Sequence, residues 1–161
     1  MNNNHSSNVN PRKCCGRIKP KEVKSAFRAL KNAETPIPTA RVNFKVSFND
    51  EQFDLSNEYN NSTSSFIAKE AGIYLFTATL SFNPTDDNVD YEFGMNLVIN
   101  GDSQDVEADY TGFNAVFFNV VDLSEIVKLN KGDKVEIFAL STTPGTVTID
   151  QRSSFAGAKL F

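Results

Sequence analysis

The sequence has no tryptophan, one histidine and two cysteines among 161 residues. Because His5 lies in a polar leader, the rest of the chain has no imidazole to form a Ser–His or Cys–His catalytic pair. No stretch approaches the roughly 18 to 20 consecutive apolar residues of a membrane-spanning helix, and the opening MNNNHSSNVN lacks the apolar core of a signal peptide. We therefore expect a soluble, non-enzymatic chain that, if exported, uses no ordinary secretory signal.

The two cysteines, Cys14 and Cys15, are neighbours in the sequence. Adjacent residues cannot join two distant elements through a structural disulfide, so this pair does not hold the fold together. Two interpretations remain open, namely two free thiols in an unstructured segment or attachment to another molecule. A metal site would need further ligands, and His5 is the only histidine available.

Charge is distributed unevenly along the chain. The first 25 residues hold one acid, Glu22, and six basic side chains, whereas the other 136 residues hold ten basic and nineteen acidic ones. The Asn, Ser, Lys and Pro content of residues 1–22 predicts a flexible basic arm, followed by a single head domain over residues 23–161. The arm has no aromatic residue for base stacking and the acidic head would repel phosphates, so we expect no nucleic-acid partner.

Aromatic residues are abundant, with fourteen Phe and four Tyr, and they favour β-structure. Turn residues such as Asn100-Gly101 and Pro144-Gly145 separate short apolar segments. The expected strands cover residues 42–48, 64–68, 73–82, 91–100, 115–129, 134–141, 146–150 and 153–161. Eight or more short strands of this kind predict an all-β sandwich or barrel.

Three of these strands are apolar on both faces. In 73–82, Tyr74 and Phe76 point to one side while Ile73 and Leu75 point to the other, because successive strand residues alternate. Residues 115–120 and 155–161 show the same property. If the three strands share one sheet, its second apolar face needs a cover, which another copy of the chain would provide. Coverage by a local loop is the alternative.

The stretch NEYNNSTSSFIAKEAGIYLFTATLSF resembles the signature of the complement C1q globular-head family. The similarity continues in LVING (97–101), VKLNKGDKVEI (127–137) and the closing SSFAGAKLF, and AFRAL (26–30) resembles the family's first strand. The collagen stalk that usually precedes such heads is missing, KEAG replaces the usual proline before the Gly-x-Tyr turn, and the head has no cysteine. The resemblance spans about residues 25–161.

This resemblance implies a ten-stranded jelly-roll sandwich of the C1q and tumour necrosis factor type, assembled as a homotrimer. It also implies that strands beginning near residues 26, 73, 115 and 153 share the sheet that packs around the threefold axis. The residues expected at the trimer interface are Phe27, Ile73, Leu75, Val116, Phe118, Val120, Ala156, Ala158 and Leu160. Those expected in the core are Phe66, Tyr74, Phe76, Phe117 and Phe155.

The resemblance and the basic arm favour a non-enzymatic structural or recognition head displayed on a bacterial cell or spore surface. Its partner would be a protein or a glycan, and Cys14 and Cys15 would attach it. The Asn-rich and Lys-rich composition is typical of an AT-rich bacterium. The alternatives are a soluble receptor ligand of the tumour necrosis factor type and a phage-encoded tip protein, and a protein that is not displayed would be cytoplasmic.

Two local features of the sequence carry further expectations. The segments TDDNVD (85–90) and DSQDVEAD (102–109) are expected to be acidic loops, in which Asp102, Asp105 and Asp109 could bind Ca²⁺. Otherwise no cofactor is expected. Gly72, at the turn before the two-faced strand, is expected to adopt a backbone conformation that a side chain disfavours.

Overall fold

The computed structural model describes residues 25–111, 119–150 and 153–161, and every regular element in these ranges is a strand. The strands are β1 (Ala26–Leu30), β2 (Thr35–Ile37), β3 (Phe44–Lys45), β4 (Asp50–Asp54), β5 (Tyr59–Asn60), β6 (Ser65–Ile67), β7 (Gly72–Pro84), β8 (Tyr91–Ile99), β9 (Asp102–Thr111), β10 (Asn119–Leu129), β11 (Lys134–Ser141), β12 (Gly145–Val147) and β13 (Ser154–Lys159). The all-β prediction is confirmed. The described residues form thirteen strands rather than ten because several segments of two or three residues also pair. No helix in these ranges is long and apolar enough to cross a membrane.

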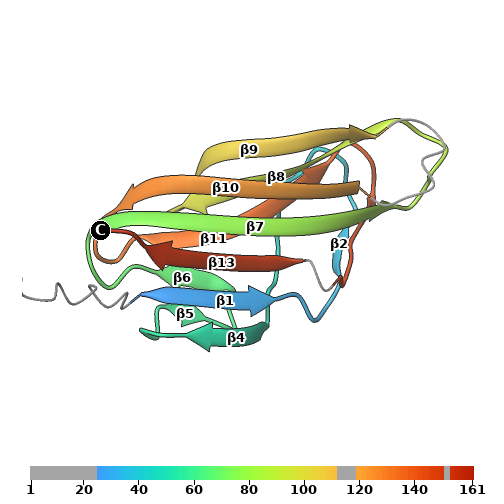
Figure 1. Ribbon diagram of the computed structural model, residues 1–161. Helices are drawn as coiled ribbons and strands as arrows, with labels where there is room; N and C mark the ends of the chain where they lie inside the picture. Colours follow the sequence, from blue (N-terminus) through green and yellow to red (C-terminus); the bar gives the residue numbers. More distant parts are fainter. Residues whose placement is uncertain (1–24, 112–118, 151–152) are drawn as a thin grey trace, which may run out of the picture.

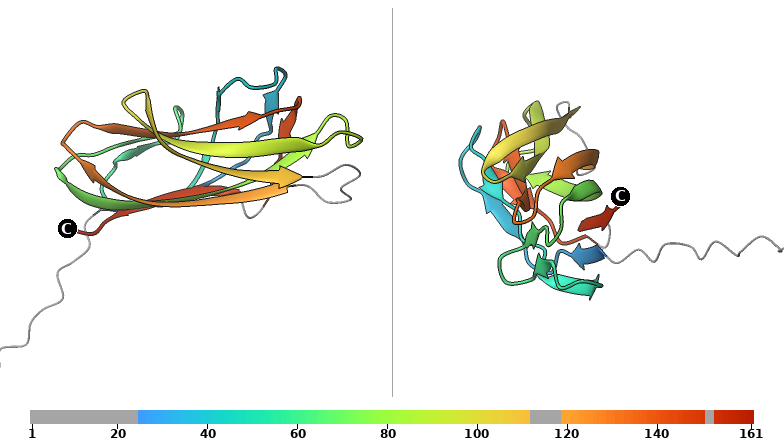
Figure 2. Two further views of the ribbon diagram at one scale, coloured as in Figure 1. Left: turned by 90° about the horizontal axis from the view of Figure 1, so that it is seen from above. Right: turned by 90° about the vertical axis from the view of Figure 1, so that its left-hand side faces the viewer.

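Two antiparallel sheets form the sandwich, as the views from the side, from above and from one end show (Figures 1 and 2). The seven-stranded sheet has the order β2-β12-β7-β13-β1-β4, with β10 also paired to β7. The six-stranded sheet has the order β5-β6-β11-β8-β9, with β3 paired to β11. Strands β1, β7, β10 and β13 therefore share one sheet, which confirms the predicted grouping.

Aromatic side chains fill the space between the sheets. Phe66, Tyr74, Phe76 and Phe155 are at most 1% exposed, so the structure places four of the five predicted core residues in the core. The rings of Phe66 and Phe76 meet edge-on with centroids 5.2 Å apart, a favourable arrangement for aromatic pairs. The fifth predicted core residue, Phe117, lies outside the described residues.

Strand β7 has the two apolar faces that its sequence predicts. Tyr74 and Phe76 are fully buried between the sheets, whereas Ile73 and Leu75 are half-buried on the opposite, outer face. The alternation follows from the pleat of the strand. The seven-stranded sheet thus carries apolar side chains on a surface that the described residues leave partly exposed.

Phe27 belongs to the core, and its placement at a subunit interface is wrong. It is 1% exposed, and its ring stacks on Tyr59 with centroids 4.6 Å apart. In the β1–β13 register Phe27 lies opposite Gly157, and a side chain at Gly157 would come within 2.8 Å of the Phe27 ring. The missing side chain makes room for the ring, and alternation then turns Arg28 to the outer face.

Gly72 is needed for space rather than for its backbone angle, which corrects the sequence-based expectation. Among the described residues, glycines with positive φ are Gly101 and Gly132, and Gly72 is not one of them. A Cβ at Gly72 would lie 2.4 Å from Cε of Lys159 and 2.4 Å from the Phe161 carbonyl oxygen. The start of β7 therefore packs directly against the last residues of the chain.

The start of β1 and residue Phe161 lie at the same end of the sandwich (Figure 1). The Lys159 amide donates a hydrogen bond to the Ser25 carbonyl at 3.0 Å. Ser25, the first described residue, therefore lies at the end of the sandwich where β13 finishes.

Candidate assembly face and polar cluster

The outer face of the seven-stranded sheet is the largest candidate surface for assembly. Register places Leu75 of β7 beside Ile126 of β10 and Ala158 of β13. Ile126 is 64% exposed and Leu160 41% exposed, whereas Leu75 is half-buried. We call this region the apolar patch, and it consists of Ile73, Leu75, Ile126, Ala158 and Leu160.

Small and polar side chains continue the same face away from the apolar patch. Thr77 of β7 lies between Ser124 of β10 and Ala156 of β13, and Ala156 lies opposite Arg28 of β1. One row further, the Thr79 hydroxyl donates a 2.6 Å hydrogen bond to Asp122. The surface is therefore mostly apolar near the end where β1 begins, with exposed Lys128 of β10 opposite Ile73, and it becomes polar toward the other end.

The predicted interface residues divide into three groups. Ile73, Leu75, Ala156, Ala158 and Leu160 lie on this outer face, and half-buried Val120 lies there too, opposite Ser81. Val116 and Phe118 lie outside the described residues, and Phe27 lies in the core. Ile126 and Arg28 were not among the predicted interface residues. Alternation from Val120 along β10 identifies Ile126, whereas Arg28 faces outward because Phe27, which was predicted at the interface, turns into the core.

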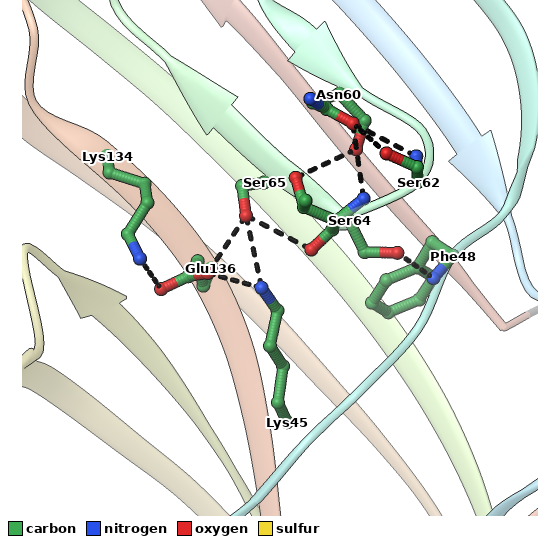
Figure 3. Close-up of polar contacts among 9 residues, drawn as sticks. Lys45, Phe48, Asn60, Ser62, Ser64, Ser65, Lys134 and Glu136 are labelled. Atoms are coloured by element: carbon green, nitrogen blue, oxygen red, sulfur yellow. Dashed lines mark hydrogen bonds and ion pairs between the residues drawn. The ribbon is translucent and has the colours of Figure 1, made fainter.

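A polar cluster on the opposite, six-stranded sheet surrounds Glu136 (Figure 3). The side chain of Glu136 is 7% exposed and forms ion pairs with Lys45 of β3 and Lys134 of β11. The Lys134 ammonium lies 2.8 Å from Oε2, and the Ser65 hydroxyl donates to Oε1 at 2.8 Å. Burial opposes ionisation of Glu136, but hydrogen bonds from Lys134, Lys45 and Ser65 outweigh it and lower its pKa to about 2.

The turn between β5 and β6 extends this cluster. Asn60 Oδ1 accepts hydrogen bonds from the amide and hydroxyl of Ser62 at 3.0 and 2.7 Å. Ser64 has a φ of 47°, in the left-handed region, and its hydroxyl accepts a hydrogen bond from the Phe48 amide at 2.8 Å. These hydrogen bonds connect the turn to β11 and to the segment before β4. The cluster therefore stabilises the packing of these strands, and its groups are paired with one another rather than arranged for a reaction.

The predicted calcium ligands do not form a loop. Asp102, Asp105 and Asp109 all lie on β9, a strand paired with β8 over its whole length. At about 3.3 Å per residue, the backbone positions of Asp102 and Asp109 are roughly 20 Å apart, too far for one cation to bind both. This ligand set is therefore wrong. Among the described residues no three His, Cys, Asp or Glu side chains form a group that could hold a metal ion.

The predicted attachment residues, Cys14 and Cys15, lie outside the described residues. The acidic segment 85–90 does connect two strands, β7 and β8. Within it Asp86 accepts the Asn88 amide at 2.9 Å, so this carboxylate stabilises its own turn.

The two antiparallel sheets and their aromatic core define a jelly-roll β-sandwich. The family model for the C1q domain matches residues 26–158, and the chain belongs to the C1q domain family. Members of the C1q and tumour necrosis factor class are generally non-enzymatic heads, typically trimeric. No curated protein sequence matches the chain significantly.

Several solved structures share the fold. The globular domain of zebrafish complement 1qA protein is 21% identical, with a TM-score of 0.58 over 86% of this chain and 98% of that one. Eiger TNF from S. frugiperda is 10% identical, with a TM-score of 0.64 over 87% of this chain and 94% of that one. Murine APRIL at pH 5.0 is 11% identical, with a TM-score of 0.62 over 84% of this chain and 98% of that one. Identities this low establish a common fold and nothing more specific.

Proposed function

We propose that the chain is a non-enzymatic head that forms a homotrimer through the outer face of its seven-stranded sheet. The trimer is displayed on a bacterial cell or spore surface, where its basic arm attaches it and the head binds a protein or glycan partner. The apolar patch is the observation that carries this proposal. Membership of the C1q family supports it, because heads of this class are typically trimeric binding modules.

The argument for assembly rests on uncovered apolar area. Ile126, Leu160 and Phe161 are 64%, 41% and 77% exposed at one end of the sheet. Monomeric proteins rarely expose contiguous apolar patches larger than a few hundred Å². A permanent interface between copies buries upward of about 2,000 Å², and it removes such side chains from water. A second and third copy are therefore the cover that this face requires.

Surface display is supported by the composition of the arm. Six basic residues and two thiols precede the head, a combination suited to electrostatic docking followed by covalent capture. Nearby cations lower the pKa of thiols and favour the reactive thiolate. A diffusible receptor ligand of the tumour necrosis factor type would not require this arm, and neither would a phage-encoded tip held by another protein.

Light scattering of the full chain tests the assembly. We expect a mass of about three chains at micromolar concentration, and we expect Ile126→Asp to give monomers because it introduces a desolvated, self-repelling charge at the interface. Ile67→Asp is the matched control, since Ile67 is 43% exposed but lies on β6 of the other sheet. A monomeric wild type, or equal effects of the two substitutions, contradicts the proposed interface.

Fractionation of the native source tests the display. We expect the protein in the cell or spore surface fraction, released only by a reductant. A variant with both Cys14 and Cys15 replaced by Ser should be extracted without one. Recovery of the wild type in the soluble fraction argues for the receptor-ligand alternative, and recovery with phage particles argues for the tip protein.

A further inference from the structure

A lysine side chain is buried at the end of the sandwich remote from Phe161, where β1 ends and β2 begins (Figure 1). Lys31 directly follows β1, and its amide continues the pairing of β1 with β13 by donating to the Ser153 carbonyl at 3.1 Å. Alternation along β1 buries Phe27 and Ala29, and Lys31 is the next residue on that side, with an exposed fraction of 4%. The Lys31 side chain therefore points between the sheets rather than into solvent.

The ammonium of Lys31 has little to compensate for its burial. Nζ donates a 2.6 Å hydrogen bond to the hydroxyl of Thr35, the first residue of β2, which lies on the same side of its strand as the fully buried Ile37. In the described part of the chain no carboxylate forms an ion pair with this Nζ. Three donors on one cation thus share a neutral acceptor, which is an unfavourable environment for a positive charge. Burial lowers the pKa of Lys31 from its ordinary value of 10.5 to about 8, and the charge of Glu34 offsets only part of this effect.

Burial makes the Lys31 amine more reactive at neutral pH, because a neutral amine is a nucleophile and an ammonium is not. With a pKa of about 8, about one Lys31 side chain in ten is neutral at pH 7, against roughly one in three thousand for an ordinary lysine. An imine nitrogen need carry no charge, so imine formation also removes the charge that the core disfavours. The 4% exposed fraction restricts such a reaction to a small carbonyl compound.

We propose that Lys31 is a modification site at which Nζ forms an imine with a small aldehyde, and that the Thr35 hydroxyl carries the proton. The Nζ lone pair forms a bond to the carbonyl carbon while the π electrons of the C=O bond move to oxygen. A proton passes from nitrogen through the Thr35 hydroxyl to that oxygen. The carbinolamine then loses its hydroxyl group and the remaining nitrogen proton as water, which leaves the C=N bond. Amine and aldehyde thus become imine and water, with no change of oxidation state.

Reductive trapping in the full chain tests the site. The protein is incubated with acetaldehyde at pH 7, the imine is reduced with cyanoborohydride, and modified lysines are located by peptide mass spectrometry. Lys31 should be modified at least about tenfold faster than Lys131, which is exposed in the turn before β11. Limited access keeps this ratio below the difference in neutral fraction. The rate at Lys31 should increase with pH and level off above a pH of about 8.

Substitutions at Thr35 test the proton transfer. Thr35→Val removes the hydroxyl at similar volume, so modification of Lys31 should slow at least about fivefold, and Thr35→Ser should restore most of the rate. Thr63→Val, at an exposed threonine of the turn between β5 and β6, is the matched control and should change the rate by less than about twofold.

The comparison of Lys31 with Lys131 uses the wild type alone, so it holds even if Thr35→Val does not fold. Modification of Lys31 no faster than that of Lys131, or only after the addition of urea, overturns the proposal. Equal rates at Lys31 in the wild type and in folded Thr35→Val overturn it as well, because the hydroxyl then carries no proton.

Discussion

Replacing Glu136 by Gln should make the protein less stable in a pH-dependent way. The folded-state pKa of Glu136 is about 2, against an ordinary value of 4.5. A carboxyl whose pKa is lower in the folded state stabilises fully above pH 4.5, and its contribution is lost as pH falls toward 2. A difference of about two and a half units sets an upper limit of roughly 3 kcal/mol. Because Lys45 and Lys134 are 34% and 46% exposed, solvent screening reduces the expected loss at pH 7 to roughly 1 to 2 kcal/mol.

Urea unfolding between pH 7 and pH 2, at one fixed protein concentration, measures this effect. The wild type should lose more stability than Glu136→Gln across the interval from pH 4.5 to 2, so the two curves should converge at the acidic end. Glu92→Gln is the control, since Glu92 is exposed on β8 of the same sheet. A constant difference between wild type and Glu136→Gln at every pH would refute the ionic origin of the stabilisation.

Two further substitutions test the packing. Gly72→Val should destabilise the fold by about 1 to 3 kcal/mol in urea unfolding, because its Cβ would overlap the Phe161 carbonyl oxygen. Ala71→Val, at an exposed position, is the control and should have little effect. Equal unfolding midpoints for the two variants would show that the chain end relaxes to accept the side chain at Gly72. Phe27→Ala should cost about 3 to 5 kcal/mol in urea unfolding, because it empties a core position stacked on Tyr59. Phe53→Ala, at a side chain that is 45% exposed, should cost much less, and a comparable loss would place Phe27 outside the core.

Sequence periodicity was sufficient where a strand is long and its two faces differ. The alternation in residues 73–82 predicts both the buried Phe76 and the outward Leu75, and the structure agrees. Periodicity was insufficient where the direction of a side chain depends on a glycine that is distant in the sequence. Phe27 turns inward because Gly157, which is far away in the sequence, leaves a space for its ring.

Short-range composition was also a poor guide to β9. Its acidic residues suggested a solvated loop, but the strand is defined by pairing with β8 rather than by its own propensity. The Glu136 cluster could not be predicted either, because Lys45, Ser65 and Glu136 come together only through the pairing of β3 and β6 with β11. Such contacts depend on which strands are neighbours, and local patterns do not specify this.

The central position of β13 affects the order in which the chain can fold. β13 lies between β7 and β1, so residues 154–159 must be available before β1 can join the long strand of its own sheet. During synthesis β1 leaves the ribosome more than a hundred residues before its partner does. Until then β1 and β7 have unpaired edges that could pair with other chains. We therefore expect productive folding to be post-translational, with the basic arm accessible to other molecules before the head is complete.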